Sequence, residues 1–114
     1  MVIVNRGDIV LCDLNPVMGT EQAGIRPVVI VQIDRANAVS PHTIIAPFTS
    51  KIRGVLLPSH VFIPASIGGL TQNSVMLGEQ IRVIDRQRVV KLLGHLDEPY
   101  MNEIDKALRT ILGL

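Results

Sequence analysis

Short hydrophobic runs, separated by polar or glycine-rich stretches, fill most of the first 96 residues. Residues 8–14 and 27–33 form the first two runs, and both have the β-branched composition that is typical of strands. The second run is almost entirely apolar, so we expect that strand to be covered on both faces. Further strands are predicted at residues 43–46, 60–63, 74–77, 80–84 and 89–96.

The connections between these runs have recognisable turn chemistry. Loops or turns are predicted at residues 34–41, 51–58 and 67–73. Pro47 lacks an amide hydrogen, so we expect the third strand to end, bulge or lie at an edge there. Phe48, Thr49 and Ser50 would then lie where regular pairing stops, at the rim of a site.

The C-terminal segment has the period of an amphipathic helix. Its apolar positions fall on one face, at Met101, Ile104, Leu108, Ile111 and Leu112. Asp97 is suited to the N-cap, Gly113 to the C-terminal end, and Asp105 and Arg109 to an i,i+4 pair. Several short strands followed by one helix predict an α+β, mostly β fold: a small, strongly bent sheet or barrel of antiparallel strands, capped by the helix.

Composition restricts the possible classes of protein. A chain of 114 residues is expected to form a single domain, residues 1–114. The net charge is only +1, so any surface that binds nucleic acid must be local. One cysteine, Cys12, excludes an internal disulfide and is expected to be a small buried hydrophobe. Arg6 and Asp8 precede any apolar segment that could form a signal peptide, so we expect a cytoplasmic protein with no membrane span.

No motif predicts a metal or a cofactor. The three histidines, His42, His60 and His95, are far apart and lack helical spacing, and no paired carboxylates accompany them. No phosphate-binding or dinucleotide fingerprint is present. Two of these histidines could in principle act together as the acid and base that cleave RNA. Their positions on strands instead favour packing or surface roles.

The polar loop between the first two strands is the strongest candidate for chemistry. Gly19 and Gly24 permit tight reversals of the chain, and Pro27 forces Arg26 into an extended conformation. An arginine held in this way, beside a strand fixed in the core, is a suitable position for a catalytic group. The alternative is an ordinary hairpin loop with solvated charges.

The same loop carries a family resemblance. The segments RGDIV at 6–10, DLNP at 13–16 and GTEQ-x-G-x-RP at 19–27 resemble the opening of the MazF/PemK-type mRNA interferase toxins. FTS at 48–50, LPSHV at 57–61, EQIRVID at 79–85 and the apolar tail at 107–114 agree in order and spacing. The resemblance implies an SH3-like barrel with a C-terminal helix and an endoribonuclease of a type II toxin–antitoxin system. It also implies sequence-specific, metal-independent cleavage of single-stranded mRNA without a cofactor.

Two other functions remain open. A toxin of the same fold could bind and inhibit a DNA topoisomerase without cutting RNA, and a small barrel could be an adaptor without toxicity. A pure binder has no need of Arg26 and Thr49 at these spacings, so these two residues discriminate between the classes.

RNA cleavage by its own 2′-hydroxyl group, which leaves 2′,3′-cyclic phosphate and 5′-hydroxyl ends, needs a proton acceptor, a proton donor and a stabiliser of the anionic phosphorane. Arg26 is suited to the last task, because its planar fork of donors matches phosphate oxygens. Thr49 can donate a hydrogen bond to the same group, and Glu21 can accept the 2′-hydroxyl proton. The resemblance implies that Arg26 and Thr49 are the catalytic pair. The alternatives are that Thr49 caps a strand end and that Glu21 is a solvated loop charge.

Residues that bind RNA are expected around this group. Gln80 and Arg82 alternate with Ile81 and Val83, and so lie together with Ile84 on one strand face. The expected binding residues are Thr20, Ser50, Lys51, Arg53, Gln80, Arg82 and Arg86, although each could equally belong to a solvated polar face. Aromatic residues are only 3% of the chain, so base recognition must rely on hydrogen bonds and on aliphatic or arginine surfaces.

Two protein partners are expected. The apolar strand at 27–33 and the apolar helix face offer more hydrophobic surface than a small domain can cover, which favours a homodimer. The resemblance implies the same, together with a cognate antitoxin whose acidic, disordered tail folds onto the toxin. Lys51, Arg53, Arg82 and Arg86 would pair with that tail.

Overall fold

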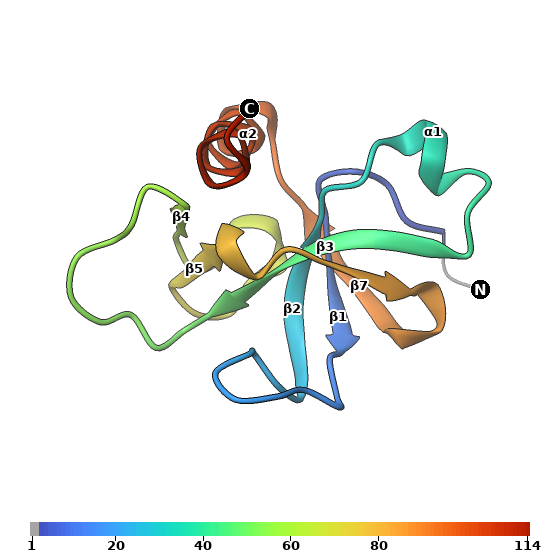
Figure 1. The fold of residues 1–114 in the computed structure, drawn as a ribbon, viewed down its shortest axis with the longest axis horizontal. Coiled ribbons are helices and arrows are strands. Elements are labelled where there is room, and N and C mark those ends of the chain that lie inside the picture. Colours follow the sequence, from blue (N-terminus) through green and yellow to red (C-terminus); the bar gives the residue numbers. More distant parts are fainter. Residues whose placement is uncertain (1–2) are drawn as a thin grey trace.

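The computed structural model describes residues 3–114. Seven strands, two helices and three 3-10 turns follow one another within these residues (Figure 1). The strands are β1 (Asp8–Asp13), β2 (Ile25–Ile30), β3 (His42–Thr49), β4 (His60–Ile63), β5 (Ser74–Leu77), β6 (Arg82–Asp85) and β7 (Val89–His95). The helices are α1 (Asp34–Asn37) and α2 (Glu98–Leu112), and the turns are η1 (Ile67–Gly69), η2 (Gly78–Gln80) and η3 (Arg86–Arg88).

All strand pairs are antiparallel, in the order β4-β5-β3-β2-β1-β7. β3 has two successive partners on one side, because its first half pairs with β6 and its end pairs with β5. This exchange bends the sheet, and Figure 1 shows β3 crossing between the two groups of strands. The α+β, mostly β fold is confirmed; within residues 3–114, β4 and β7 do not pair, so the bent sheet is not closed into a complete barrel.

The third strand was expected to end, bulge or lie at an edge at Pro47, and it does not end there. β3 continues to Thr49, and Pro47 is opposite Val28 of β2. The proline is tolerated because it falls where β3 changes partners: pairing with β6 stops at Ile45, and pairing with β5 starts at Phe48. Phe48 and Thr49 are therefore paired residues, and the rim begins after them.

Other boundaries also differ from the predictions. β2 ends at Ile30 and not at residue 33, and the polar stretch after it contains the short helix α1. Asn37 of α1 is buried and accepts a hydrogen bond from Thr43 Oγ1 at 2.8 Å, so this stretch is anchored to β3. β6 begins at Arg82, because Gln80 belongs to η2.

The core lies on both faces of the sheet. One cluster packs between the sheet and α2, and includes Ile9, Val29, Ala46, Phe48, Met76, Met101 and Ile104. The other lies on the opposite face, and includes Val10, Cys12, Val28, Ile30, Ile45 and Ile84. Successive residues of β2 enter different clusters, which confirms that this strand is covered on both faces. Burial raises the pKa of the Cys12 thiol to about 11, even though Arg82 and Arg88 oppose the shift, so this cysteine is a buried hydrophobe as expected.

Helix α2 covers one end of the sheet (Figure 1). Asp97 holds the N-cap position without a side-chain cap bond, and Gly113 ends the helix with φ 72°. Met101, Ile104 and Ala107 are buried, but Ile111 and Leu112 are about half exposed, so the apolar face reaches the core only over its first three turns. Asp105 contacts Arg6 of the N-terminal segment and not its expected partner, Arg109.

The apolar surfaces expected to form a dimer lie mostly inside the protein. Exposed apolar side chains are found instead on β6 and β7, at Val83, Val90 and Leu92, and in the loop between β3 and β4, at Val55, Leu56 and Leu57. None of the helices in residues 3–114 has the length and apolar composition needed to cross a membrane.

Candidate active site

Arg26 is the second residue of β2, and the loop before it is closed by two hydrogen bonds. Leu14 N donates to Gly24 O at 3.0 Å, and Gly24 N donates to Asn15 Oδ1 at 3.1 Å. Gly24 has φ 80°, a conformation that glycine adopts at little cost. Arg26 is half-buried, and its Nε donates to Ala23 O at 2.6 Å, so the same loop end orients the guanidinium.

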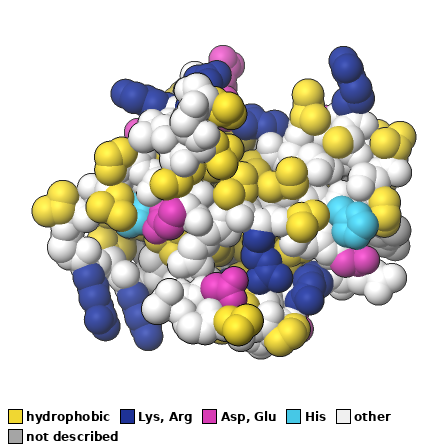
Figure 2. Space-filling view, viewed as in Figure 1, with side chains coloured by type: hydrophobic (Ala, Val, Ile, Leu, Met, Phe, Trp, Pro, Cys, Tyr) yellow, Lys and Arg dark blue, Asp and Glu magenta, His cyan; other side chains and the backbone are white. Residues whose placement is uncertain are grey.

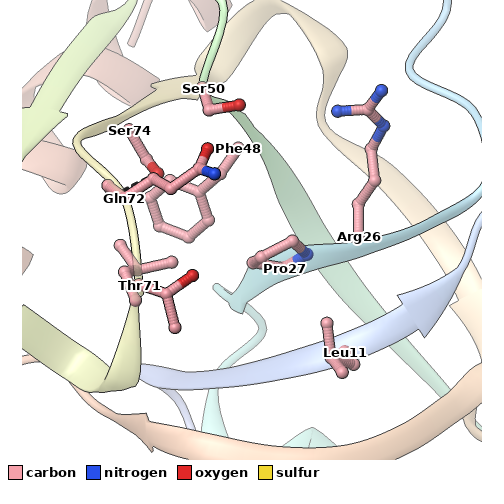
Figure 3. Close-up of a pocket in the computed structure, with 9 residues that line it drawn as sticks. Leu11, Arg26, Pro27, Phe48, Ser50, Thr71, Gln72 and Ser74 are labelled. Atoms are coloured by element: carbon pink, nitrogen blue, oxygen red, sulfur yellow. Dashed lines mark hydrogen bonds between the residues drawn. The ribbon is translucent and has the colours of Figure 1, made fainter. Parts of the chain in front are cut away.

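Arg26 lines a pocket of about 280 Å³. The floor and walls are Leu11, Pro27, Phe48, Ser50, Leu70, Thr71, Gln72 and Ser74. In Figure 3 the guanidinium stands on one side, Gln72 and Ser74 stand on the other, and Ser50 lies between them at the edge. An arginine beside hydroxyl and amide groups, over an apolar floor, is an arrangement that can bind a phosphate and the sugar next to it.

Thr49 lies on the neighbouring strand, at the position that matches Arg26. β2 and β3 pair at Val28–Pro47, Val29–Ala46 and Ile30–Ile45. The same register continued by two residues places Arg26 opposite Thr49 and on the same face of the sheet. The ladder stops before that point because β3 turns toward β5, where Thr49 pairs with Val75. The two strand ends therefore diverge, with one candidate catalytic group on each.

Thr49 also has the capping contact that was the alternative for it. Its Oγ1 accepts a hydrogen bond from Lys51 N at 3.2 Å. A hydroxyl that accepts in this way keeps its own hydrogen for donation, so capping and a role toward a phosphate are compatible. Thr49 lines a second pocket, of about 100 Å³, together with Lys51, Arg53 and His60.

Glu21 is not in the pocket of Arg26. Its Oε1 accepts from Met18 N at 2.5 Å, and its own amide donates to Met18 O at 3.2 Å, so the carboxylate closes a turn within the loop. Its side chain instead lines a third pocket, between this loop and η2. The structure thus brings Arg26 and Thr49 to adjacent strand ends and places Glu21 on the exposed loop that leads to Arg26.

The expected RNA-binding residues separate into three groups. Ser50 lies in the pocket of Arg26, and the exposed Lys51 and Arg53 lie in the pocket of Thr49. Gln80 and Arg82 lie in the third pocket, where Gln80 Nε2 is 3.5 Å from the carbonyl of Thr20. Figure 2 shows lysine and arginine side chains in separate groups on this face, not in one continuous basic patch.

Arg86 is placed differently from the other expected binding residues. It is only 9% exposed, and its Nη1 donates to Asn37 O at 2.8 Å and to Ser40 O at 3.3 Å. These contacts hold the end of α1 against the sheet. We therefore leave Arg86 out of the proposed binding surface, because its guanidinium is occupied with backbone carbonyls inside the protein.

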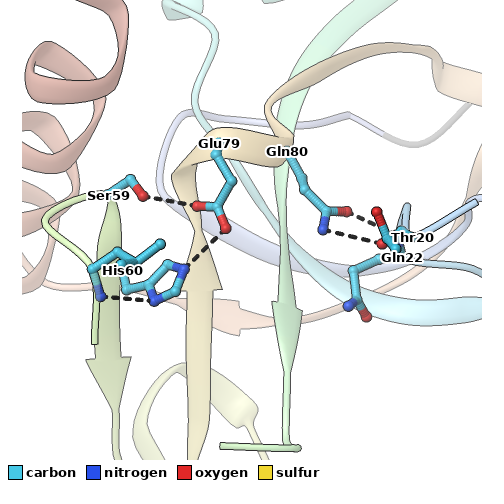
Figure 4. Close-up of polar contacts among 7 residues, drawn as sticks. Thr20, Gln22, Ser59, His60, Glu79 and Gln80 are labelled. Carbon is cyan, nitrogen blue, oxygen red and sulfur yellow. Dashed lines mark hydrogen bonds and ion pairs between the residues drawn. The ribbon is translucent and has the colours of Figure 1, made fainter. Parts of the chain in front are cut away.

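Two parts of the site were missed by the sequence analysis. Thr71, Gln72 and Ser74 face Arg26 across its pocket, and the polar character of Thr71 and Gln72 within a glycine-rich connection was the available signal. The other part is a network around Glu79 (Figure 4). Ser59 Oγ donates to Glu79 Oε1 at 2.8 Å, and His60 Nε2 lies 2.9 Å from Glu79 Oε2. His60 Nδ1 accepts from Leu57 N at 3.1 Å, so in the neutral ring Nε2 carries the hydrogen and donates to Glu79.

Turn η2 therefore holds two loops at once. The Glu79 carboxylate contacts Ser59 and His60 at the start of β4. His60 in turn accepts a hydrogen bond from Leu57 N at the end of the loop between β3 and β4. Gln80, its neighbour, accepts from Gln22 N at 2.8 Å in the loop between β1 and β2 (Figure 4). Gly78 makes this possible, because a Cβ there would lie 2.6 Å from the carbonyl oxygen of Ser59.

We expect Glu79 to make stability depend on pH. Burial alone would raise the pKa of Glu79, but hydrogen bonds from His60, the backbone and Ser59 outweigh it and hold the pKa below 4.5. A lowered folded-state pKa stabilises the fold above the unfolded value, and this contribution is lost as the pH falls through the folded pKa. Glu79→Gln should therefore unfold at lower urea concentration than the wild type at pH 7, and the gap should narrow below pH 4.5. Glu103→Gln, on the exposed side of α2, is the control; an unchanged gap across this range would contradict the expectation.

Within residues 3–114, no group of three His, Cys, Asp or Glu side chains is placed to hold a metal ion.

Comparison with known proteins gives a consistent picture. A family model described as "PemK-like, MazF-like toxin of type II toxin-antitoxin system" matches residues 5–112. Endoribonuclease EndoA of Bacillus subtilis is 46% identical over 113 residues, which are 99% of this chain and 97% of that protein.

Solved structures agree in fold over the full length. MazF from Deinococcus radiodurans superposes with a TM-score of 0.85 at 27% identity, covering 100% of both chains. An endoribonuclease from a mycobacterial species, solved in complex with its cognate antitoxin, has a TM-score of 0.81 at 25% identity, with 97% of this chain and 96% of that one covered. The family match and the 46% identity extend over nearly the whole chain, including the loop, the strand ends and the η2 turn described above. This chain belongs to the PemK-like, MazF-like toxin family of type II toxin–antitoxin systems.

Proposed function

We propose that this protein is a sequence-specific, metal-independent endoribonuclease that cleaves single-stranded mRNA as the toxin of a toxin–antitoxin pair. The observation that carries the proposal is the 46% identity to an endoribonuclease over nearly the whole of both chains. The pocket of Arg26, with a cation beside polar groups that can hold a phosphate and its sugar, is consistent with this activity. Its place of action would be the cytoplasm, where mRNA is found.

The reaction proposed is an attack by the RNA on itself. The 2′-oxygen forms a bond to the phosphorus while the bond from phosphorus to the 5′-oxygen breaks, which leaves a 2′,3′-cyclic phosphate and a 5′-hydroxyl. Glu21 accepts the 2′-hydroxyl proton, the departing 5′-oxygen takes up a proton from water, and Arg26 and Thr49 stabilise the charge on the phosphorane. Glu21 is the only carboxylate between Asp13 and Arg26, so it is the acid-base group that this loop can supply.

A topoisomerase-binding toxin is the weaker alternative. Such a protein works by surface contact alone, and nothing in its task requires an arginine oriented by its own loop toward a polar pocket. The relatives described above are named as endoribonucleases or MazF.

The direct test uses the purified protein and a long RNA in the presence of a chelator. Cleavage should persist, and the upstream fragments should end in 2′,3′-cyclic phosphate. A single 2′-deoxy substitution at a mapped cut site should block cleavage there, because it removes the nucleophile. Cleavage of the deoxy-substituted strand would show that another nucleophile is used and would refute the mechanism.

The proposed protein partners are a second copy of the chain and an antitoxin with an acidic, disordered tail. The antitoxin complex of a relative supports the second. The loop between β3 and β4 is a suitable surface for such a tail, because Lys51 and Arg53 are exposed there beside the apolar Val55, Leu56 and Leu57.

We expect antitoxin binding to weaken as salt is added. Exposed cations lose most of their attraction to a peptide as the Debye length falls from about 10 Å at 0.1 M salt to about 3 Å at 1 M. Titration with an acidic antitoxin-tail peptide at these two salt concentrations should show the loss of affinity. The double variant Lys51→Ala, Arg53→Ala should have a smaller difference in affinity between the two concentrations. Affinity that is independent of salt would exclude the electrostatic contribution of this loop.

A further inference from the structure

The third pocket lies between the loop after β1 and turn η2. It has a volume of about 170 Å³ and is lined by Leu14, Glu21, Gln22, Pro47, Glu79, Gln80, Ile81 and Arg82. Pockets for drug-sized ligands begin at roughly 300 Å³, so this one has room for a single planar ring and not for a whole nucleotide. Neither Arg26 nor Thr49 lines it, but Glu21, the proposed proton acceptor, does, so the pocket adjoins the proposed catalytic groups on the side of the loop.

Gln22 has an unused hydrogen-bond acceptor in this pocket. Its Oε1 is buried, and no donor among residues 3–114 reaches it. The backbone of Gln22 is well anchored, because its amide donates to Gln80 Oε1 at 2.8 Å (Figure 4). A buried acceptor without a donor is destabilising, and so its position here needs a functional reason.

Donors are present on the opposite side of the same pocket. Gln80 Nε2 has only a long contact, 3.5 Å, to Thr20 O. Arg82 Nη1 donates to Leu14 O at 3.2 Å, but a guanidinium has five N–H groups, so others remain available. Leu14, Pro47 and Ile81 supply apolar walls, which suits the faces of a flat ring in a chain with few aromatic residues.

We propose that this pocket binds one base of the RNA, and that Gln22 Oε1 accepts a hydrogen bond from the exocyclic amino group of that base. The proposal rests on the proposed RNA-cleaving function and adds a specificity determinant to it. Adenine, cytosine and guanine carry such a group, and single-stranded RNA is read through these base edges. Uracil carries no exocyclic amino group, so it offers no such donor to Gln22 Oε1.

The first test compares cut sites in a randomised RNA pool for the wild type, Gln22→Leu and Gln87→Leu. Wild-type sites should have one position at which uracil is excluded, and Gln22→Leu should relax that position by about 10-fold or more while the other positions keep their preference. Gln22→Leu leaves the backbone anchor to Gln80 in place, and Gln87 is an exposed glutamine of η3, which makes it a matched control. Gln22→Met is a second variant in case Leu perturbs the loop.

The second test removes the amino group from the base at that position, with purine for adenine, pyrimidin-2-one for cytosine or hypoxanthine for guanine. The wild type should cut the altered RNA about 10-fold more slowly, and Gln22→Leu should be insensitive to the change. Two results would overturn the proposal. One is that Gln22→Leu cuts with unchanged base preference, and the other is that the wild type requires uracil at the position that Gln22→Leu relaxes.

A binding arm separates this proposal from the proposed function. The Arg26→Ala protein is used to select RNA from the same pool, with and without Gln22→Leu. If the wild type cuts RNA but Gln22→Leu changes no preference, the base pocket alone is refuted. If the wild type cuts nothing while Gln22 still governs the selected bases, the cleavage function alone is refuted, and if RNA is neither cut nor selected, both are.

Discussion

Arg26→Ala should lower the rate of RNA cleavage by about 10²-fold or more, because removing one preorganised donor to a transition-state anion has a cost of this size in other enzymes. The loss should appear mainly in kcat if the guanidinium stabilises the phosphorane more than the bound substrate. Arg26→Lys should recover only part of the rate, since an ammonium keeps the charge but not the planar fork.

The fold should survive this substitution. Arg26 is half-buried at the second position of β2, and its side chain donates to Ala23 O in the adjacent loop. Arg35→Ala, an exposed arginine of α1, is the charge-matched control and should leave the rate unchanged. An Arg26→Ala protein with full activity and a normal melting temperature would contradict the proposed role.

Gly94→Ala should strongly destabilise the fold, although it adds only one methyl group to β7. An added Cβ would lie 2.4 Å from Gly68 O and 2.9 Å from Gly69 N, both of which are backbone atoms of η1. Side chains can rotate away from such an overlap, but two packed backbones cannot, so we expect a cost of about 1–3 kcal/mol or more. Gly94 does not have a positive φ, so the cost comes from the overlap and not from backbone conformation.

The measurement is the free energy of unfolding in urea, with Lys91→Ala as a control on the same strand. Lys91 is exposed, and its replacement should change stability by less than about 0.5 kcal/mol. Gly94→Ala should also impair cleavage. The reason is that η1 leads into Thr71, Gln72 and Ser74, which form the wall opposite Arg26. Stability equal to that of the Lys91→Ala control would show that η1 can move aside freely.

The elements of the fold could be predicted from the sequence because each has a local cause. The apolar run that contains Val28, Val29 and Ile30 had to be covered on both faces, and the helical period and Gly113 fixed α2. The candidate catalytic residues Arg26 and Thr49 came from local chemistry and from the family resemblance. Errors occurred where a local rule was overridden: Pro47 remains within β3 because the strand exchanges partners there.

The grouping of the site residues depended on contacts between distant parts of the chain. Arg86 looked like its exposed neighbours, but packing turned it inward to the carbonyls of Asn37 and Ser40. Gln22 and Gln80 are 58 positions apart, and only the fold places them in one pocket and leaves Gln22 Oε1 without a donor. The sequence by itself determined which residues could form strands, a helix and a phosphate-binding group, because these depend on neighbours along the chain. The tertiary structure alone decided which polar atoms are already satisfied and which remain available to a ligand, because hydrogen bonds form between groups that folding brings together.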